Sequence, residues 1–200
     1  MLIKIPLIII AVLSFLYIFW KRLREDYVAS QIFTVAFYIL FGLVIGGVGA
    51  YYYLPKFTFW MSFMGGVIGL WIGVTRYRLR IFETIEAAVA GALLILASVH
   101  IIELLEELNM ISGIWEGVVI ALIILYYLLG KHYKKFTWYA SGRVGFAGMS
   151  VIGIYFIIRC LIALALSDMV SFENSLEIML SGLVAFASFF AVYNLAGKTT

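Results

Sequence analysis

Charged residues and proline are both scarce in this chain. Of its 200 residues, 12% are charged and two are proline, whereas 65% are hydrophobic. A soluble domain is about half apolar and about a quarter charged, so this chain lacks the polar surface that would keep it in water. The scarcity of proline suits long uninterrupted helices. The composition therefore predicts an all-α membrane protein.

Cysteine is nearly absent as well. Cys160 is the single cysteine, which excludes an internal disulfide and a thiolate metal cluster, and its apolar surroundings indicate a packed thiol. The sequence shows no cluster of metal ligands, no phosphate-binding glycine loop before a helix and no serine–histidine–acid set. The formal net charge of +3 is too small to indicate nucleic acid as a partner. We therefore expect no metal and no cofactor.

Seven apolar runs are long enough to cross a hydrocarbon core of about 30 Å, which takes roughly 17–25 helical residues. They lie at Leu2–Trp20, Ile32–Leu54, Phe57–Thr75, Ile81–Leu105, Ile114–Gly130, Val144–Leu166 and Leu176–Leu195. The connections between them are short, and none resembles a soluble domain. The sequence therefore predicts one polytopic domain over residues 1–200 with seven transmembrane helices.

The basic residues indicate how these helices are oriented. Of the 14 Lys and Arg residues, 11 follow odd-numbered runs: Lys21, Arg22, Arg24, Arg76, Arg78, Arg80, Lys131, Lys134, Lys135, Arg143 and Lys198. The other side would hold Lys4 and Lys56, and Arg159 lies inside a run. Because cytoplasmic loops of membrane proteins are enriched in Lys and Arg, we expect the N-terminus outside and the C-terminus in the cytoplasm.

Glycines recur at helical spacing in the second and third runs. Gly42 and Gly46 are four residues apart, as are Gly65, Gly69 and Gly73. On a helix this spacing forms a stripe without side chains, and in lipid such a stripe lets a second backbone approach closely. We expect these two runs to pack tightly against each other.

Arg159 is the charged residue that lies deepest in a run. At a rise of about 1.5 Å per residue it is roughly 22 Å along the sixth run, in the outer half of the membrane. A charge within a membrane helix costs about 2.5–3.5 kcal/mol on insertion scales, so it faces a partner or a polar cavity. Its guanidinium could hold a lipid phosphate by forked hydrogen bonds. It could also form a structural ion pair with Glu103 or Glu116, or extend toward the headgroups.

His100 lies near the outer boundary by the same estimate, roughly 29 Å along the fourth run. It could serve as a base toward an alcohol or thiol, or it could be a hydrated helix end. Glu103 follows at i+3 on the same face and could orient the imidazole. The aromatic residues of this end are typical of an interfacial belt: Trp60, Trp115, Tyr51, Tyr52 and Tyr53.

Several motifs resemble those of the prolipoprotein diacylglyceryl transferases. Met61–Gly69 reads Met-Ser-Phe-Met-Gly-Gly-Val-Ile-Gly and resembles the family's Met-Ser-Phe-His-Gly-Gly-hydrophobic-hydrophobic-Gly element. Gly46–Tyr51 is similar to its Gly-Ala-Arg-hydrophobic-Gly-Tyr stretch, and Ile114–Gly117 resembles the Leu-Tyr-Glu that begins its next membrane helix. Tyr155–Arg159 looks like its late, arginine-bearing helix, and Ser175–Ser181 falls where it has its final Gly-Gln-Ile-Leu-Ser helix. Seven helices with an outer N-terminus are also that family's arrangement.

The resemblance implies a reaction at the outer leaflet of the cytoplasmic membrane of a prokaryote. The diacylglyceryl group of phosphatidylglycerol would be transferred to the lipobox cysteine thiol of a lipoprotein precursor. Arg159 would hold the lipid phosphate, and His100 would be the base or a second phosphate contact. The implied substrate-binding residues are Glu103, Glu116, Tyr51, Met64, Gly65 and Gly66.

The chain departs from the family pattern at positions that carry this chemistry. Met64 stands where the family has a histidine, and His100 stands where it has an arginine. The arginine of the Gly-Ala-Arg stretch is missing, and Ala163 replaces the acid expected four residues after Arg159. The alternative function is a non-catalytic phospholipid-binding or assembly subunit of the membrane. A transporter is a third alternative, although no broken helix or internal repeat is evident.

Overall fold

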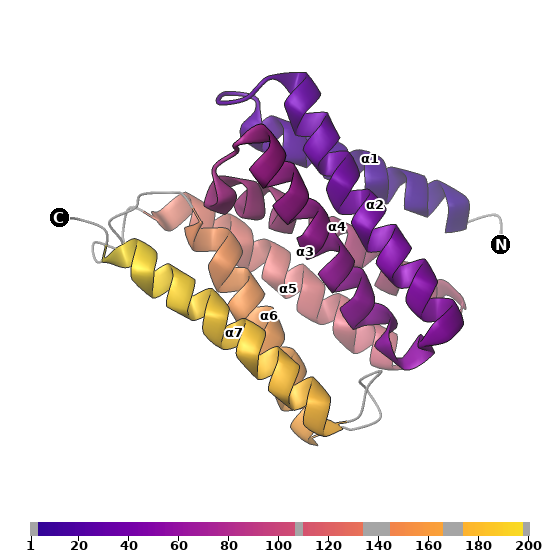
Figure 1. Ribbon diagram of the computed structural model, residues 1–200. Helices are drawn as coiled ribbons and strands as arrows, with labels where there is room; N and C mark the ends of the chain where they lie inside the picture. The colour runs from indigo at the N-terminus through magenta and orange to yellow at the C-terminus, as the bar shows by residue number, and fades with distance from the viewer. Residues whose placement is uncertain (1–3, 107–109, 134–144, 166–173, 198–200) are drawn as a thin grey trace.

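The computed structural model describes residues 4–106, 110–133, 145–165 and 174–197 (Figure 1). Within these ranges the chain forms seven α-helices and no strand, and each helix is long and apolar enough to cross a membrane. They are α1 (Lys4–Leu23), α2 (Ala29–Tyr53), α3 (Thr58–Tyr77), α4 (Ile81–Glu106), α5 (Met110–His132), α6 (Phe146–Ala165) and α7 (Asn174–Ala196). A 3-10 turn at Pro55–Phe57 joins α2 to α3. The prediction of seven membrane-length helices is confirmed.

Several helices are longer than the apolar runs that predicted them. Lys21 and Arg22 lie in the last turn of α1, where we expected them to follow the helix. A cation in the last turn interacts favourably with the helix dipole. The ammonium group of Lys21 also lies 5.7 Å from the centre of the Tyr17 ring, one turn back. The apolar pattern alone therefore placed the end of α1 too early.

The helices form pairs within one bundle (Figure 1). α2 packs against α3 on one flank, α6 packs against α7 on the other, and α4 and α5 lie between these pairs, with α1 against α4. In α6, 56% of the apolar span is buried inside the bundle, against 17–28% in the other six helices. α6 is therefore the most enclosed helix, and it is the helix that carries Arg159.

Hydrogen bonds tie the α1–α2 and α3–α4 connections together. The hydroxyl of Tyr27 donates to the carboxylate of Glu83 over 3.3 Å and accepts the backbone N–H of Arg80 over 2.9 Å. Burial raises the pKa of the Tyr27 phenol, although the bond from Arg80 opposes this, so the hydroxyl remains a donor at neutral pH. Both connections therefore lie at the same end of the bundle, which we call the basic end.

Glu86 of α4 brings α5 and α6 to the end of α1 at the basic end. Its Oε1 lies 3.7 Å from a terminal guanidinium nitrogen of Arg22, and its Oε2 accepts the backbone N–H of Gly145 over 2.7 Å. The hydroxyl of Tyr126 donates to its backbone carbonyl over 3.3 Å. The helices therefore alternate in direction, as the sequence predicts. Of the basic residues used in that prediction, Lys134, Lys135, Arg143 and Lys198 lie outside the described residues.

The expected glycine contact between α2 and α3 is confirmed. A Cβ atom built on Gly42 would lie 2.1 Å from the carbonyl oxygen of Gly65, and one built on Gly46 would lie 2.1 Å from that of Met61. No real Cβ atom approaches an oxygen so closely, so the two backbones meet only because these positions lack side chains. Gly49, further along α2, has no atom within 4 Å of such a Cβ and takes no part in the contact.

Candidate functional site

Arg159 forms a buried ion pair with Glu177. The residue is 6% exposed, and its Nε–H donates to Oε1 of Glu177 over 2.8 Å. Of the alternatives left open by the sequence, the structural ion pair is present, but its partner is Glu177 and neither Glu103 nor Glu116. Glu177 lies in the first turn of α7, which packs directly against α6, whereas the two expected partners lie on α4 and α5.

Both carboxylate oxygens of Glu177 are fully used. Oε1 also accepts the hydroxyl of Ser181 over 2.9 Å, and Oε2 accepts the indole N–H of Trp60 over 2.7 Å. Glu177 has no exposed surface. A buried ion pair repays its desolvation only when further hydrogen bonds satisfy the remaining lone pairs, and here they do. One carboxylate thereby connects α3, α6 and α7.

Aromatic rings enclose the guanidinium of Arg159. Its central carbon lies 3.7 Å from the centre of the Phe59 ring and 5.5 Å from the centre of the Trp115 ring, within the range of cation–π attraction. A terminal nitrogen also donates to the hydroxyl of Tyr155 over 3.4 Å. The guanidinium is thus shielded as well as neutralised.

Two of the tryptophans assigned to an interfacial belt lie inside the bundle. Trp60 and Trp115 are each 5% exposed, and both contact the Arg159–Glu177 pair. The belt assignment is wrong for these two because their rings are the ones that cover the buried pair. The tyrosines Tyr51–Tyr53 are exposed at the end of α2. We call this end, opposite the basic end, the tyrosine end.

His100 lies beside the same cluster. Its ring stacks on Trp115 with centroids 6.2 Å apart, and its Nδ1 lies 3.2 Å from Oε2 of Glu103. Ser112 donates to the same carboxylate oxygen over 3.4 Å. The predicted i+3 contact is confirmed, and so is the prediction that His100 and Arg159 lie at the same end. The side chain of His100 is 14% exposed, so the imidazole is oriented by a carboxylate and still reaches the surface of the bundle.

Glu116 adds a further acid to this cluster. Its Oε2 is buried and has no hydrogen-bond partner among the described residues. Glu116 interacts electrostatically with His100, and with Glu103 and Glu177 it gives the cluster three carboxyl groups against the single guanidinium of Arg159. Such a balance disfavours a phosphate at this position.

The other predicted substrate-binding residues lie outside the cluster around Arg159. Tyr51 is 69% exposed and Met64 is 48% exposed, both on the surface of the bundle. Gly65 lies against the backbone of α2, and Gly66 has Leu43 as its nearest neighbour, 3.8 Å from a built Cβ. In this chain the double glycine therefore serves the packing of α2 against α3.

The sequence analysis assigned no role to Glu177, Phe59 or Ser181. A signal for Glu177 was present, because it is the acid at the start of the run that follows the arginine-bearing run. Two consecutive helices joined by a short connection pack side by side and antiparallel, so opposite charges on their facing sides can form an ion pair. Ser181 follows Glu177 at i+4 and so shares its face. Phe59 carries no comparable signal.

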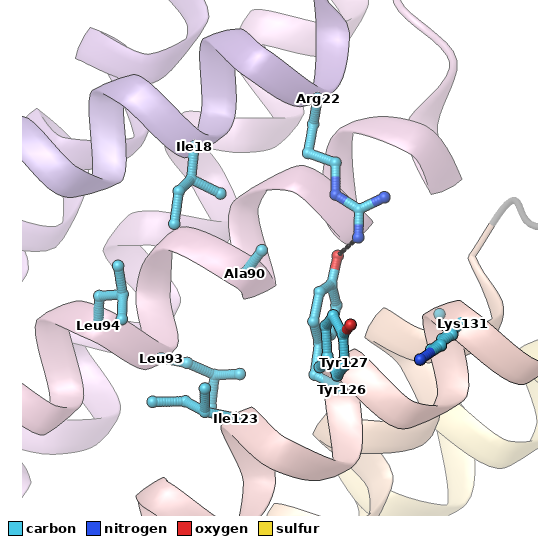
Figure 2. A pocket seen from close by; sticks show the side chains of 10 residues that line it. Ile18, Arg22, Ala90, Leu93, Leu94, Ile123, Tyr126, Tyr127 and Lys131 are labelled. Carbon is cyan, nitrogen blue, oxygen red and sulfur yellow. Dashed lines mark hydrogen bonds between the residues drawn. The ribbon is translucent and has the colours of Figure 1, made fainter.

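A second candidate site is a pocket of about 290 Å³ at the basic end, between α1, α4 and α5 (Figure 2). Arg22 and Lys131 line one side of it, and Ile18, Leu94 and Ile123 line the other. Arg22 donates to the hydroxyl of Tyr126 over 2.5 Å, as the dashed line in Figure 2 marks. The sequence analysis did not predict this pocket, although both cations were identified at the ends of their runs.

The fold and these two sites define a helical protein with seven candidate membrane spans and a closed ion pair within the bundle. No group of three His, Cys, Asp or Glu residues in the described ranges could hold a metal ion. Comparisons with protein-family models, with characterised proteins and with solved structures find no match to this chain.

Proposed function

We propose that this chain is a non-catalytic phospholipid-binding protein of the cytoplasmic membrane of a prokaryote. The observation that carries the proposal is that the guanidinium of Arg159 is buried and already paired with a carboxylate. A transferase of the resembling family would need this guanidinium for the lipid phosphate. Here Glu177 neutralises it and aromatic rings cover it, so a phosphate would have to displace a satisfied carboxylate.

The lipid-binding part of the proposal is supported at the basic end. The pocket between α1, α4 and α5 combines an apolar wall with two cations, which is the pattern that an amphipathic lipid requires. Among the described residues, the cluster around Arg159 offers no comparable positive site, because its carboxyl groups outnumber its guanidinium.

Diacylglyceryl transfer to a lipoprotein precursor remains the second candidate function. It is favoured by His100, which is oriented by Glu103 and partly exposed, as a general base would be. Met64 and the occupied Arg159 count against it, because neither supplies the contact to phosphate that the reaction needs.

Purified protein should co-purify with phospholipid and form no product when it is given labelled phosphatidylglycerol and a lipobox peptide. The bound lipid is measured by extraction after extensive washing in detergent, and the peptide is followed by its gain in mass. Labelled peptide would contradict the non-catalytic assignment. In that case His100→Ala should slow the reaction by about 10²–10⁴, the usual contribution of a general base.

We also propose that the basic end faces the cytoplasm, so that the N-terminus lies outside. The gathering of Arg22, Arg80 and Lys131 at this end supports the assignment. In a variant lacking Cys160, a cysteine at Lys56 should react with an impermeant thiol reagent in sealed cells. A cysteine at Glu25, on the exposed α1–α2 connection, should react only after the membrane is opened. Labelling with the opposite pattern would reverse the orientation.

A further inference from the structure

We infer that the pocket at the basic end selects phospholipids with a negatively charged headgroup. The inference rests on the proposed phospholipid-binding function and names the site and the class of lipid. The headgroup phosphate would lie between Lys131 and Arg22, and part of one acyl chain would follow the apolar wall.

The order of side chains along the helices supports this placement. Ile18 precedes Arg22 by about one helical turn on α1, and Ile123 precedes Lys131 by about two turns on α5. On α4, which runs in the opposite direction, Leu94 follows the helix start at Ile81 by more than three turns. The cations therefore lie toward the helix ends and the apolar wall toward the middle of the bundle, which is the polarity of a lipid in a membrane.

Lys131 is the cation of the pocket whose charge is not shared with an acidic side chain of the described residues. Its ammonium lies 5.9 Å from the centre of the exposed Tyr127 ring and has no carboxylate partner among the described residues. Arg22 shares its charge with Glu86 at 3.7 Å, and Glu86 in turn accepts the backbone N–H of Gly145. Two cations against one carboxylate leave the pocket positive, so an anionic headgroup is favoured over a zwitterionic one.

The pocket is large enough for the headgroup of a phospholipid and the first part of one acyl chain. At about 290 Å³ it lies near the lower limit of small-molecule sites. A headgroup with the first part of one chain fills such a space, and the remaining chain stays in the bilayer. Lys131 and Gly130, which both line the pocket on α5, are therefore the positions that test the inference.

The test is native mass spectrometry of purified protein incubated with equal amounts of phosphatidylglycerol and phosphatidylethanolamine. Wild-type protein should retain phosphatidylglycerol in preference, and Lys131→Ala should lower this preference about fivefold, the effect of one lysine near a lipid headgroup. Lys21→Ala is the matched control, because Lys21 is exposed at the same end and does not line the pocket.

Gly130→Leu tests the pocket without removing charge. A Cβ atom at Gly130 meets nothing within 4 Å, so the leucine enters open space and should lower retention of phosphatidylglycerol without a steric clash. Gly117→Leu is the control for the change in helix propensity, because Gly117 lies on the same helix and is equally open.

The possible outcomes separate this inference from the proposed function. Wild-type protein that retains neither lipid would overturn the proposed function. Retention of both lipids without preference would overturn only the inference, as would a Lys131→Ala variant that matches Lys21→Ala. A Gly130→Leu variant that retains lipid as well as Gly117→Leu would show that the lipid binds elsewhere.

Discussion

Arg159→Met alone should lower the free energy of unfolding by about 3–5 kcal/mol, the usual cost of removing one partner of a buried ion pair. The carboxylate of Glu177 would remain buried between α6 and α7 without its counter-charge. The double variant Arg159→Met/Glu177→Leu should recover most of this loss, because it removes both charges and keeps the volume apolar. Thermal unfolding in detergent measures both effects.

Arg76→Met is the control for this comparison. Arg76 is exposed in the last turn of α3, so its replacement should change stability by less than about 0.5 kcal/mol. If the double variant is as unstable as Arg159→Met, the two residues do not act as a structural unit. If Arg159→Met keeps full stability and loses bound phospholipid, Arg159 is a lipid ligand after all.

Gly69→Leu should prevent the close contact between α2 and α3. A Cβ atom at this position would already lie 2.1 Å from the carbonyl oxygen of Tyr38, and a backbone atom cannot turn away as a side chain can. Overpacking costs about 1–3 kcal/mol in ordinary cores, and the backbone contact places this variant at the upper end of that range. We expect a lower melting temperature and a lower yield from membranes.

Gly49→Leu is the matched control for Gly69→Leu. It makes the same chemical change on α2, but at a position whose surroundings are open, so any shared effect reflects helix propensity alone. Equal melting temperatures for the two variants would show that the contact between α2 and α3 contributes nothing to stability.

The sequence predicted position along the bundle better than it predicted which side of each helix faces its neighbours. Hydropathy and rise per residue placed His100 and Arg159 at the same end, and the structure bears this out. Which side of a helix faces its neighbours is decided by packing, which an apolar sequence with little amphipathic pattern does not reveal. This is why Trp60 was assigned to the surface, whereas Glu177 was missed although its place at the start of the seventh run indicated it.

The glycine contact between α2 and α3 was predictable because glycine spacing shows which side of a helix faces its neighbour. Glycines spaced four residues apart lie on one side of a helix even when every other residue is apolar. Gly42 and Gly65 therefore indicated the sides on which α2 and α3 contact each other. The pocket at the basic end was not predictable, because it needs the ends of α1 and α5 to lie beside each other. Neither helix follows the other in sequence, so no local pattern records that proximity.

The carboxylate that joins α3, α6 and α7 belongs to the last of these three helices along the chain. Arg159 precedes Glu177 by 18 residues in the chain, so α6 leaves the ribosome before the helix that carries its counter-charge. Trp60 lies on α3, so its indole N–H gains the acceptor Glu177 only when α7 has packed. A chain that stops short of α7 would therefore carry an uncompensated charge in its most enclosed helix, which is the kind of defect that membrane quality control can recognise. α7 therefore supplies the counter-charge that α6 lacks on its own.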